Sequence, residues 1–334
     1  MEEQLYQACS DGKIEEVIKL LQNSQINTNW QNQNDHLDYF NAPLHVACWN
    51  GHIEIVKLLL NDQRVDINQA NRSGKTPFYH ACHKGHIEVV KLLLNDHRVD
   101  INKANNVDYS PFWIACFHGH IEIVKLLVND QRVDVKRPSQ SGETPFLVAS
   151  HCRHIEIVKY LLASGREMDI NKAAKIGKTP FYLACFYGRI DIVKLLLNDK
   201  RVDINKAADR YGYTPFFSAC VNGQLDIIES IIASGREVSV NIKDENKKTA
   251  INIIRGKGNV EKAFLESEEG FQKRKRDCSK IVELLESFER NPNETRFKLG
   301  LKLGLAGKIQ FSFFLSFFFL FLFSFFFLMF ILSR

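Results

Sequence analysis

The heptad Thr76-Pro77-Phe78-Tyr79-His80-Ala81-Cys82 decides the fold of this 334-residue chain, because near-copies of it return at a constant spacing. The prolines of the six copies stand at positions 43, 77, 111, 145, 180 and 215, in steps of 34 or 35 residues. Such a period is typical of architectures in which each unit buries its apolar face only by stacking on its neighbours. The sequence therefore predicts a solenoid, whose extended surface suits binding.

A second block follows each heptad at a constant offset. It runs from Gly85 to Asp96, and its closer or looser copies begin at Gly51, Gly119 and Gly188. Thr76 can cap a helix by accepting a backbone N–H, and Pro77 at the first helical position gives up a donor that would have no partner there. Gly85 suits the left-handed residue that ends such a helix. The heptad therefore predicts a short helix that begins at its proline.

The second block has the periodicity of an amphipathic helix from about residue 86 to residue 94. Its expected core residues are three and four positions apart, namely Ile87, Val90, Leu93 and Leu94. Glu88 and Lys91 are expected to face outward as an i,i+3 pair. Each unit therefore consists of two short antiparallel helices joined by a tight turn, followed by a hairpin-like loop.

Together the two blocks resemble the ankyrin repeat, whose pattern is Thr-Pro-Leu-His-x-Ala, then Gly-His, then an apolar helix. The resemblance covers residues 2 to 290 and about eight repeats, six of them clear. It implies an all-α solenoid of stacked helix-turn-helix units, to which the C-terminus adds a hydrophobic helix. The expected segments are ankyrin repeats 1–7 in 2–247, a degenerate last repeat with a charged insertion in 248–290, a basic linker in 291–308 and a transmembrane tail or low-complexity segment in 309–333.

One position departs from the ankyrin pattern in most repeats. The family's histidine is present as His45, and the equivalent positions of later repeats hold Tyr79, Trp113, Leu147, Tyr182 and Phe217. Aromatic and apolar side chains stabilise through buried area and ring geometry. We therefore expect stacking to replace side-chain hydrogen bonding between the repeats.

The cysteines predict core packing. Six of the eight occupy the same small position of successive units, namely Cys9, Cys48, Cys82, Cys116, Cys185 and Cys220. Stacked helices lie about 8–10 Å apart, beyond the ~7 Å between Cα atoms that a disulfide tolerates. No Cys-x-x-Cys pair or Cys/His spacing typical of a metal site is present in the sequence. The sequence therefore predicts buried, reduced thiols.

Motifs that carry catalysis are absent from the sequence. It contains no phosphate-binding loop, no Gly-x-Ser-x-Gly and no His-Glu-x-x-His. Histidines do recur in register, at His52, His86, His120 and His154. Each begins its own second helix, which favours a structural role over metal ligation. The expectation is a non-enzymatic protein without a metal or cofactor.

Two surfaces are candidates for partner binding. The ankyrin resemblance implies contacts through loop tips and through the exposed ends of first helices. Those ends carry an aromatic residue or a histidine in five successive units, a set that we call the recognition stripe: Trp49, His83, Phe117, His151 and Phe186. Such rings could anchor a partner along a concave face, or they could fill the groove between neighbouring first helices.

The loops supply the second surface, which we call the loop edge. Its tips contain ten Lys and Arg against three Asp and Glu, and its representative cations are Arg72, Lys103, Arg137, Lys175 and Arg210. This excess predicts an acidic protein partner whose binding weakens with salt. A solvated basic edge without a partner is the alternative. Nucleic acid is a weaker one, because no recognised nucleic-acid module accompanies the charge.

The C-terminal segment differs in composition. Residues 309–333 carry no charge, and at about 1.5 Å per residue a helix of this length could cross a hydrocarbon layer of ~30 Å. The cations before it are Arg296, Lys298, Lys302 and Lys308, and the positive-inside tendency would leave the repeats in the cytosol. One interpretation is therefore a tail anchor with Phe311, Phe319 and Phe327 in the membrane.

A second interpretation of the tail stays open. Residues 311–328 are all Phe, Ser or Leu, which have codons made wholly of pyrimidines, so a translated polypyrimidine tract would produce the same segment. Without the tail, the run Lys273-Arg274-Lys275-Arg276 could act as a nuclear import signal, although such runs are more often simply solvated. The expected location is cytoplasmic, membrane-anchored if the tail is genuine, with the nucleus as a minor alternative.

These observations leave two classes of function. The first is a non-enzymatic protein–protein interaction scaffold or adaptor that uses the recognition stripe and the loop edge. The second is a regulatory subunit that inhibits or delivers a partner enzyme. An activity assay on the captured partner would separate the two classes.

Overall fold

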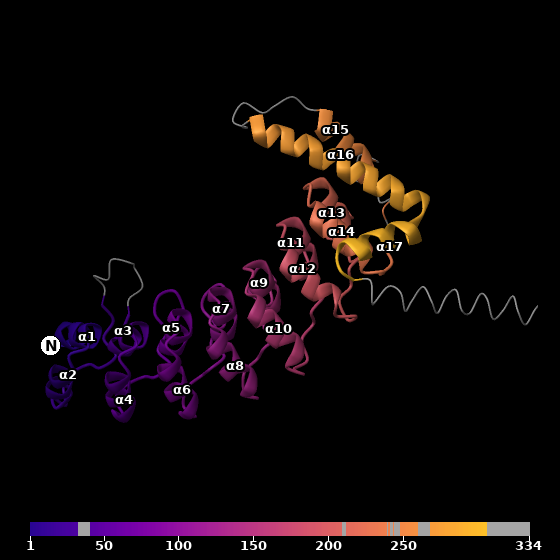
Figure 1. Ribbon diagram of the computed structural model, residues 1–334. Coiled ribbons are helices and arrows are strands. Elements are labelled where there is room, and N and C mark those ends of the chain that lie inside the picture. The colour runs from indigo at the N-terminus through magenta and orange to yellow at the C-terminus, as the bar shows by residue number, and fades with distance from the viewer. Residues whose placement is uncertain are drawn as a thin grey trace, which may run out of the picture. The chain divides into compact units, whose positions relative to one another are not determined.

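The computed structural model describes residues 1–32, 41–208, 212–238, 240, 243, 248–259 and 268–305, and these residues fold into helices without a strand (Figure 1). Two compact units divide the chain, residues 1–180 and residues 181–334. The all-α ankyrin-type arrangement of helix pairs is confirmed. The predicted tail, including Phe311, Phe319 and Phe327, lies outside the described residues. Within the described residues, no helix combines the length and apolar character needed to cross a membrane.

The described part of the first unit forms five helix pairs. They are α1 (Glu2–Asp11) with α2 (Ile14–Leu21), α3 (Pro43–Asn50) with α4 (Ile53–Asn61), α5 (Pro77–Lys84) with α6 (Ile87–Asn95), α7 (Pro111–His118) with α8 (Ile121–Asn129), and α9 (Pro145–His151) with α10 (Ile155–Ala163). Each first helix packs against the first helices of its neighbours, and the second helices stack in the same way. This unit is therefore a two-layered array (Figure 1).

Capping explains where the first helices begin and end. The Thr76 hydroxyl accepts a hydrogen bond from the backbone N–H of Tyr79 at 3.1 Å, and the proline occupies the first helical position as predicted. The same cap recurs in later repeats, at Ser110, Thr144 and Thr214. Gly85 ends α5 in the left-handed region, with φ of +83°.

The buried residues recur at equivalent positions of successive repeats, but the second helix α6 buries a different set of residues from the one predicted. Phe78, Phe112 and Phe146 are each 1% exposed and fill equivalent positions between the layers. In α6 the buried residues are Val89, Val90, Leu93 and Leu94, whereas Ile87 is half-buried. The prediction that Ile87 belongs to the core is therefore wrong. A second helix contacts both its own first helix and the adjacent second helices, so its buried stripe is wider than a simple three–four spacing indicates.

The outward ion pairs of the second helices are confirmed. Lys91 Nζ lies 2.7 Å from the Glu88 carboxylate, and the equivalent pairs of three other repeats are Glu54–Lys57, Glu122–Lys125 and Glu156–Lys159. Both partners of each pair are exposed, so each pair contributes little to the free energy of unfolding. The pairs keep the outer surface of the array polar.

The second unit contains the last repeats. Its helices are α11 (Pro180–Phe186), α12 (Ile190–Leu197), α13 (Pro215–Val221), α14 (Leu225–Ala233), α15 (Ala250–Asn259), α16 (Glu268–Arg290) and α17 (Pro292–Lys302). The sequence predicts a degenerate last repeat with a charged insertion in 248–290. The structure shows that much of this segment is a single helix, α16, which is 23 residues long.

The segment expected to be a basic linker contains α17, which packs on α14 and α16. Asn291 caps this helix by accepting the backbone N–H of Glu294 at 3.2 Å, and Pro292 follows at the first helical position. Lys302 Nζ reaches the Glu229 carboxylate at 2.6 Å, and that carboxylate's side chain is only 8% exposed. Residues 292–302 therefore close one side of the second unit.

Candidate protein-binding surface

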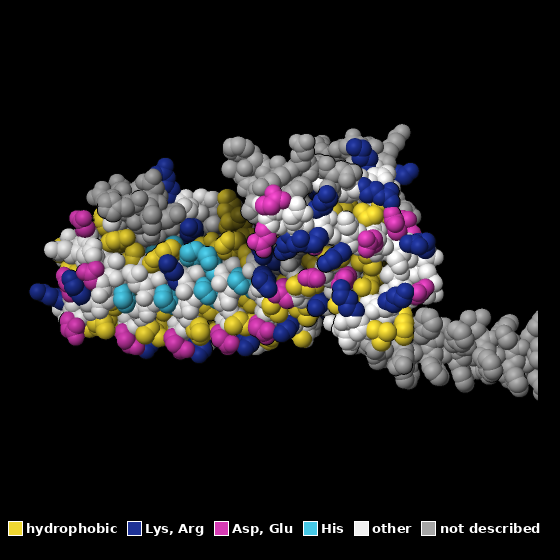
Figure 2. All heavy atoms as spheres, turned by 45° about the horizontal axis from the view of Figure 1, so that its top comes forward, with side chains coloured by type: hydrophobic (Ala, Val, Ile, Leu, Met, Phe, Trp, Pro, Cys, Tyr) yellow, Lys and Arg dark blue, Asp and Glu magenta, His cyan; other side chains and the backbone are white. Residues whose placement is uncertain are grey.

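The recognition stripe lies at the C-terminal ends of the first helices. Trp49, His83 and His151 are half-buried, and the side chain of Phe117 is 40% exposed. Phe186 is half-buried and belongs to the second unit. The first unit therefore holds four of the five predicted stripe residues. Figure 2 shows histidine side chains gathered on one face of this unit.

Ring contacts connect the stripe from one repeat to the next. The rings of Trp49 and His83 stack with centroids 5.2 Å apart and an interplanar angle of 18°. His83 meets the edge of His118 at 4.4 Å, and His118 meets Phe117 at 4.9 Å. Lys84 Nζ lies 4.1 Å from the centroid of Trp49. These side chains fill the groove between α3, α5 and α7 and also keep accessible surface. Filling the groove and offering rings to a partner, the two roles expected for the stripe, are therefore compatible.

A second set of stacks fixes the stripe within each helix. Phe117 stacks on Trp113 at 5.4 Å, and Trp113 stacks on Tyr109 at 3.9 Å. In the second unit, Phe186 stacks on Tyr182 at 6.1 Å. The ring beside it, Tyr187, is 44% exposed. The aromatic residues that replace the family's histidine therefore support the stripe residues one helical turn later.

Hydrogen bonding between repeats is retained at Trp113, where it was expected to be lost. His45 Nε2 lies 3.1 Å from the carbonyl oxygen of Lys75, just before the next repeat's heptad. Trp113 Nε1 donates to the equivalent carbonyl, that of Glu143, at 2.9 Å. The expectation that stacking replaces hydrogen bonding is therefore wrong for Trp113. The indole N–H has the reach of an imidazole N–H and so can occupy the same role.

The histidines that precede the second helices form hydrogen bonds with backbone carbonyl groups of the stripe residues. Nε2 of His86 lies 2.8 Å from the carbonyl oxygen of Trp49. The same contact joins His120 to the carbonyl of His83 at 2.9 Å, and His154 to that of Phe117 at 2.8 Å. Each histidine thus satisfies a helix-end carbonyl that has no partner within its own helix. The histidine of one repeat positions the stripe residue of the repeat before it.

Acid should destabilise the first unit because of His45. The His45 ring is 1% exposed, its Nδ1 accepts the N–H of Ala42 at 3.1 Å, and its Nε2 faces a carbonyl, which together require the neutral imidazole. Burial lowers the pKa of His45 to about 4, and burial also lowers the pKa of His80 well below its usual value. Both depressed pKa values favour the neutral folded state.

The sign of the pH effect follows from these depressed pKa values. Between about pH 6.5 and pH 4 the unfolded chain binds protons that the folded one does not, so stability is complete above this window and is lost as the pH falls through it. We expect His45 alone to cost about 2 kcal/mol between pH 7 and pH 5. Urea unfolding at the two pH values measures this loss, His45→Gln should reduce it, and equal stability at both would contradict the assignment.

The loop edge is less cationic than its composition indicates. Lys103 Nζ donates to the carbonyl of Asn68 at 2.9 Å, and the Arg137 guanidinium pairs with Asp108 at 3.0 Å. Arg72 and Lys175 are exposed, whereas Arg210 lies outside the described residues. Backbone hydrogen bonds join successive loop tips, from Asn106 to Ser73, from Gln140 to Val107 and from Lys175 to Ser141. The loops of the first unit therefore form one continuous edge on which two of the predicted cations, Arg72 and Lys175, are exposed.

Two apolar side chains at the loop tips were not among the predicted site residues. Val107 is 40% exposed and Ile176 is 62% exposed. Both stand in tip positions where other repeats have a small or polar residue, which is the signal that could have identified them. They add apolar contact area to the edge between its charges.

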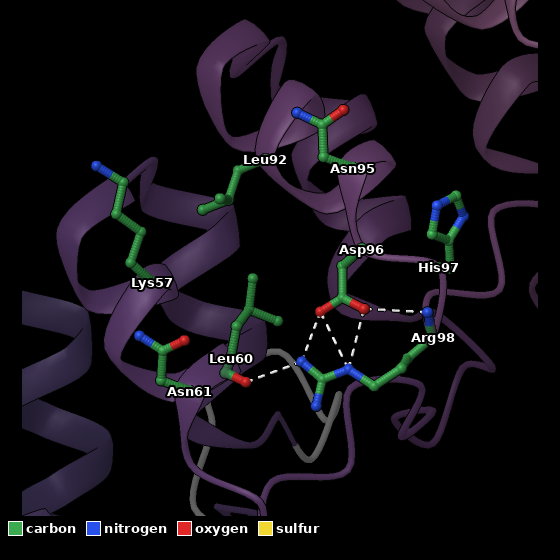
Figure 3. A pocket seen from close by; sticks show the side chains of 8 residues that line it. All are labelled: Lys57, Leu60, Asn61, Leu92, Asn95, Asp96, His97 and Arg98. Carbon is green, nitrogen blue, oxygen red and sulfur yellow. Dashed lines mark hydrogen bonds and ion pairs between the residues drawn. The ribbon is translucent and has the colours of Figure 1, made fainter.

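A cleft between α4 and α6 measures about 540 Å³. Figure 3 shows its residues, with the Arg98 guanidinium clasped by Asp96 at 2.6 Å and hydrogen-bonded to the carbonyl of Leu60 at 2.9 Å. Hydrogen bonds from Arg98 lower the pKa of Asp96. Equivalent arginines in other repeats make the same clasp, at Arg64, Arg132 and Arg201. This cleft is therefore a repeated structural junction.

The comparisons with known proteins agree with this architecture. A family model described as "Ankyrin repeats (3 copies)" matches residues 5–105, 99–174 and 166–244. Among solved structures, the crystal structure of the human ASB11 ankyrin repeat domain has a TM-score of 0.57 and 22% sequence identity, over 72% of this chain and 98% of that one. At this identity the likeness shows the fold alone. No curated protein sequence matches the chain.

Proposed function

This chain belongs to the ankyrin-repeat family, and from that premise we propose that it is a non-enzymatic adaptor that binds an acidic protein partner with its recognition stripe and loop edge. Ankyrin repeats are in general protein–protein interaction modules with extended binding surfaces. The observation that carries the proposal is the run of ring contacts from Trp49 through His83 and His118 to Phe117. These rings are held on a rigid backbone, and preorganised aromatic anchors bind with little entropic cost.

The loop edge supports the acidic character of the partner. Arg72 and Lys175 are exposed on two separate tips of a continuous edge, where they can accelerate the encounter with a negatively charged surface. Val107 and Ile176 supply apolar contacts beside them. The expected interface thus has aromatic anchors on the first helices and a polar, cationic rim on the loops.

Joint replacement of Trp49, Phe117 and Phe186 by alanine should abolish capture of the main partner. Central aromatic anchors each contribute about 2 kcal/mol or more, so the affinity for the captured partner should fall more than about 30-fold. Affinity measured with purified chain and partner tests this, with circular dichroism to confirm folding. Tyr160→Ala, an aromatic change on the second helix α10, is the matched control, and undiminished binding by the triple variant would sink the proposal.

The captured partner also separates the two classes of function. If the partner is an enzyme whose activity changes when the stripe is occupied, the chain is a regulatory subunit. An adaptor leaves that activity unchanged. Assaying the partner with the wild-type chain and with the triple variant resolves the two, because only the former occupies the partner's surface.

We also propose that residues 309–333 display the repeats on the cytosolic side of a membrane. The support is the uncharged 25-residue segment preceded by the cations Arg296, Lys298, Lys302 and Lys308. Fractionation of cells that express the full chain or a chain ending at residue 308 tests this proposal. Recovery of the full chain in the soluble fraction, with the shorter chain, would contradict it and leave a cytoplasmic or nuclear protein.

A further inference from the structure

The first helices of the first unit are unusual in their charge. Helices α3, α5, α7 and α9 carry five of the chain's eleven histidines but no aspartate or glutamate, and these histidines are His45, His80, His83, His118 and His151. Lys84 adds a permanent cation at the end of α5. The surface of these helices therefore carries a lysine and several titratable imidazoles, and no carboxylate on the same helices balances their positive charge.

Two of these imidazoles use neither ring nitrogen in a hydrogen bond to a described residue, whereas His80 leaves only its buried Nδ1 without one. His45 uses both ring nitrogens, and the histidines that begin second helices each use Nε2. His83 and His118 differ, because their ring nitrogens make no hydrogen bond to any residue that the structure describes. They meet edge to face at 4.4 Å on the stripe, where His83 is half-buried and His118 is exposed. A ligand can therefore reach the exposed His118 ring and the half-buried His83 ring beside it, of which Nδ1 is itself buried.

Tyr79 stacks on His83 with centroids 6.2 Å apart, and every other charged or titratable group that faces the pair is cationic or becomes so. Those around His83 are His80 and Lys84 on its own helix, Lys75 before it, His118 on α7 and His120 at the start of α8; those around His118 include His154 at the start of α10. Burial, followed by these neighbours, lowers the pKa of His83 to about 4 and lowers the pKa of His118. Near neutral pH both imidazoles are therefore uncharged in the free protein.

We propose that His83, His118 and Lys84 form a subsite that binds a carboxylate of an acidic partner peptide, with uptake of a solvent proton by the imidazole pair. The carboxylate supplies the missing negative charge and accepts N–H hydrogen bonds from rings that otherwise have no partner. Charge-assisted hydrogen bonds of this kind are about twice as strong as neutral ones. The rings of Trp49 and Phe117 flank the subsite, so apolar side chains of the same peptide would lie beside it. This inference rests on the proposed function and specifies its chemistry.

Proton uptake fixes the direction of the pH effect. The bound carboxylate favours the charged imidazole, so the pKa is higher in the complex than in the free chain, and affinity rises as the pH falls. Returning one imidazole to its ordinary pKa of about 6.5 makes binding about fourfold tighter at pH 6.0 than at pH 7.5. Lysine and arginine side chains in general stay charged at these pH values, so binding at the loop edge alone would be independent of pH.

Isothermal titration of the full chain with the peptide acetyl-(Glu-Leu)₄-amide tests the subsite, with acetyl-(Gln-Leu)₄-amide as the uncharged match. Repeating the titration in buffers of different ionisation enthalpy counts the protons taken up. We expect tighter binding of the Glu peptide at pH 6.0, with net proton uptake at neutral pH. The joint variant His83→Gln/His118→Gln should lose both effects, whereas His97→Gln, an exposed histidine of an outer loop, should keep them.

Four other results would each contradict the proposed carboxylate subsite. Equal binding of the two peptides, no detectable binding of the Glu peptide, binding without proton uptake, or proton uptake retained by the double glutamine variant would each do so. The proposed function fails separately, when the captured partner remains bound to the chain that lacks Trp49, Phe117 and Phe186. A partner lost on that variant, together with pH-independent peptide binding, would therefore retain the adaptor and remove only the carboxylate subsite.

Discussion

Replacing Phe112 with alanine should lower the free energy of unfolding by about 3–5 kcal/mol, the cost of deleting a large ring from a closed core. The side chain is 1% exposed and occupies the same position as Phe78 and Phe146 in the neighbouring repeats. Because each repeat of a solenoid is stabilised by its two interfaces, a cavity in α7 weakens its contacts with both α5 and α9. Urea unfolding followed by circular dichroism measures the loss.

The same helix offers a matched control. Phe117→Ala deletes an identical ring that is 40% exposed, leaves little cavity and should cost about 1 kcal/mol or less. The two variants therefore separate stability from recognition, because Phe112 supports the fold and Phe117 belongs to the stripe. Similar losses of stability for both variants would mean that the assignment of the core and the stripe is wrong.

Gly85→Ala should also be strongly destabilising, by about 2–4 kcal/mol, because it combines backbone strain with a steric clash. Gly85 has φ of +83°, where a side chain is strained, and a Cβ built there would lie 2.7 Å from Cε1 of His120. The ring must then move, which breaks its hydrogen bond to the carbonyl of His83. The expected loss is larger than that of an ordinary exposed glycine, and thermal or urea unfolding checks it.

Gly223→Ala is the control for the contact with histidine. Gly223 follows the first helix α13 at the equivalent position, with φ of +71°, but a Cβ there meets no atom of the described residues within 4 Å. It should therefore show only the backbone strain, about 1 kcal/mol. Equal losses for the two substitutions would show that the packing of His120 on Gly85 contributes nothing.

Local signals were sufficient to predict the repeated part of the fold. The caps at Thr76 and Gly85 act within one helix, so their chemistry can be recognised in a single copy and checked in the others. The error at Ile87 has a different origin, since the face that a second helix buries depends on helices of adjacent repeats. The packing of α17 likewise depends on Glu229, which is far away in sequence. Its start signal, Asn291 followed by Pro292, was nevertheless present.

The candidate site was predictable in position but not in interactions. The two residues after each heptad were expected to reach a surface, and Phe117 does. The partners that neutralise or fix these groups come from other repeats, as in the pair of Arg137 with Asp108 or the bond from Trp113 to the carbonyl of Glu143. These contacts join residues about 30 positions apart in the sequence. They depend on how successive repeats stack, which the sequence pattern of one repeat does not specify.

The bond from each histidine to the preceding repeat changes where one module ends. Trp49 directly follows one copy of the heptad, but the group that holds its carbonyl, His86, lies beyond the next heptad. A cut before Thr76 separates Trp49 from His86, and a cut between His86 and Ile87 separates His83 from His120. Each bond spans 37 residues, more than one repeat, so a single transplanted repeat never carries both a ring and its anchor. A binding specificity should therefore move intact only in chimaeras that exchange at least two consecutive repeats.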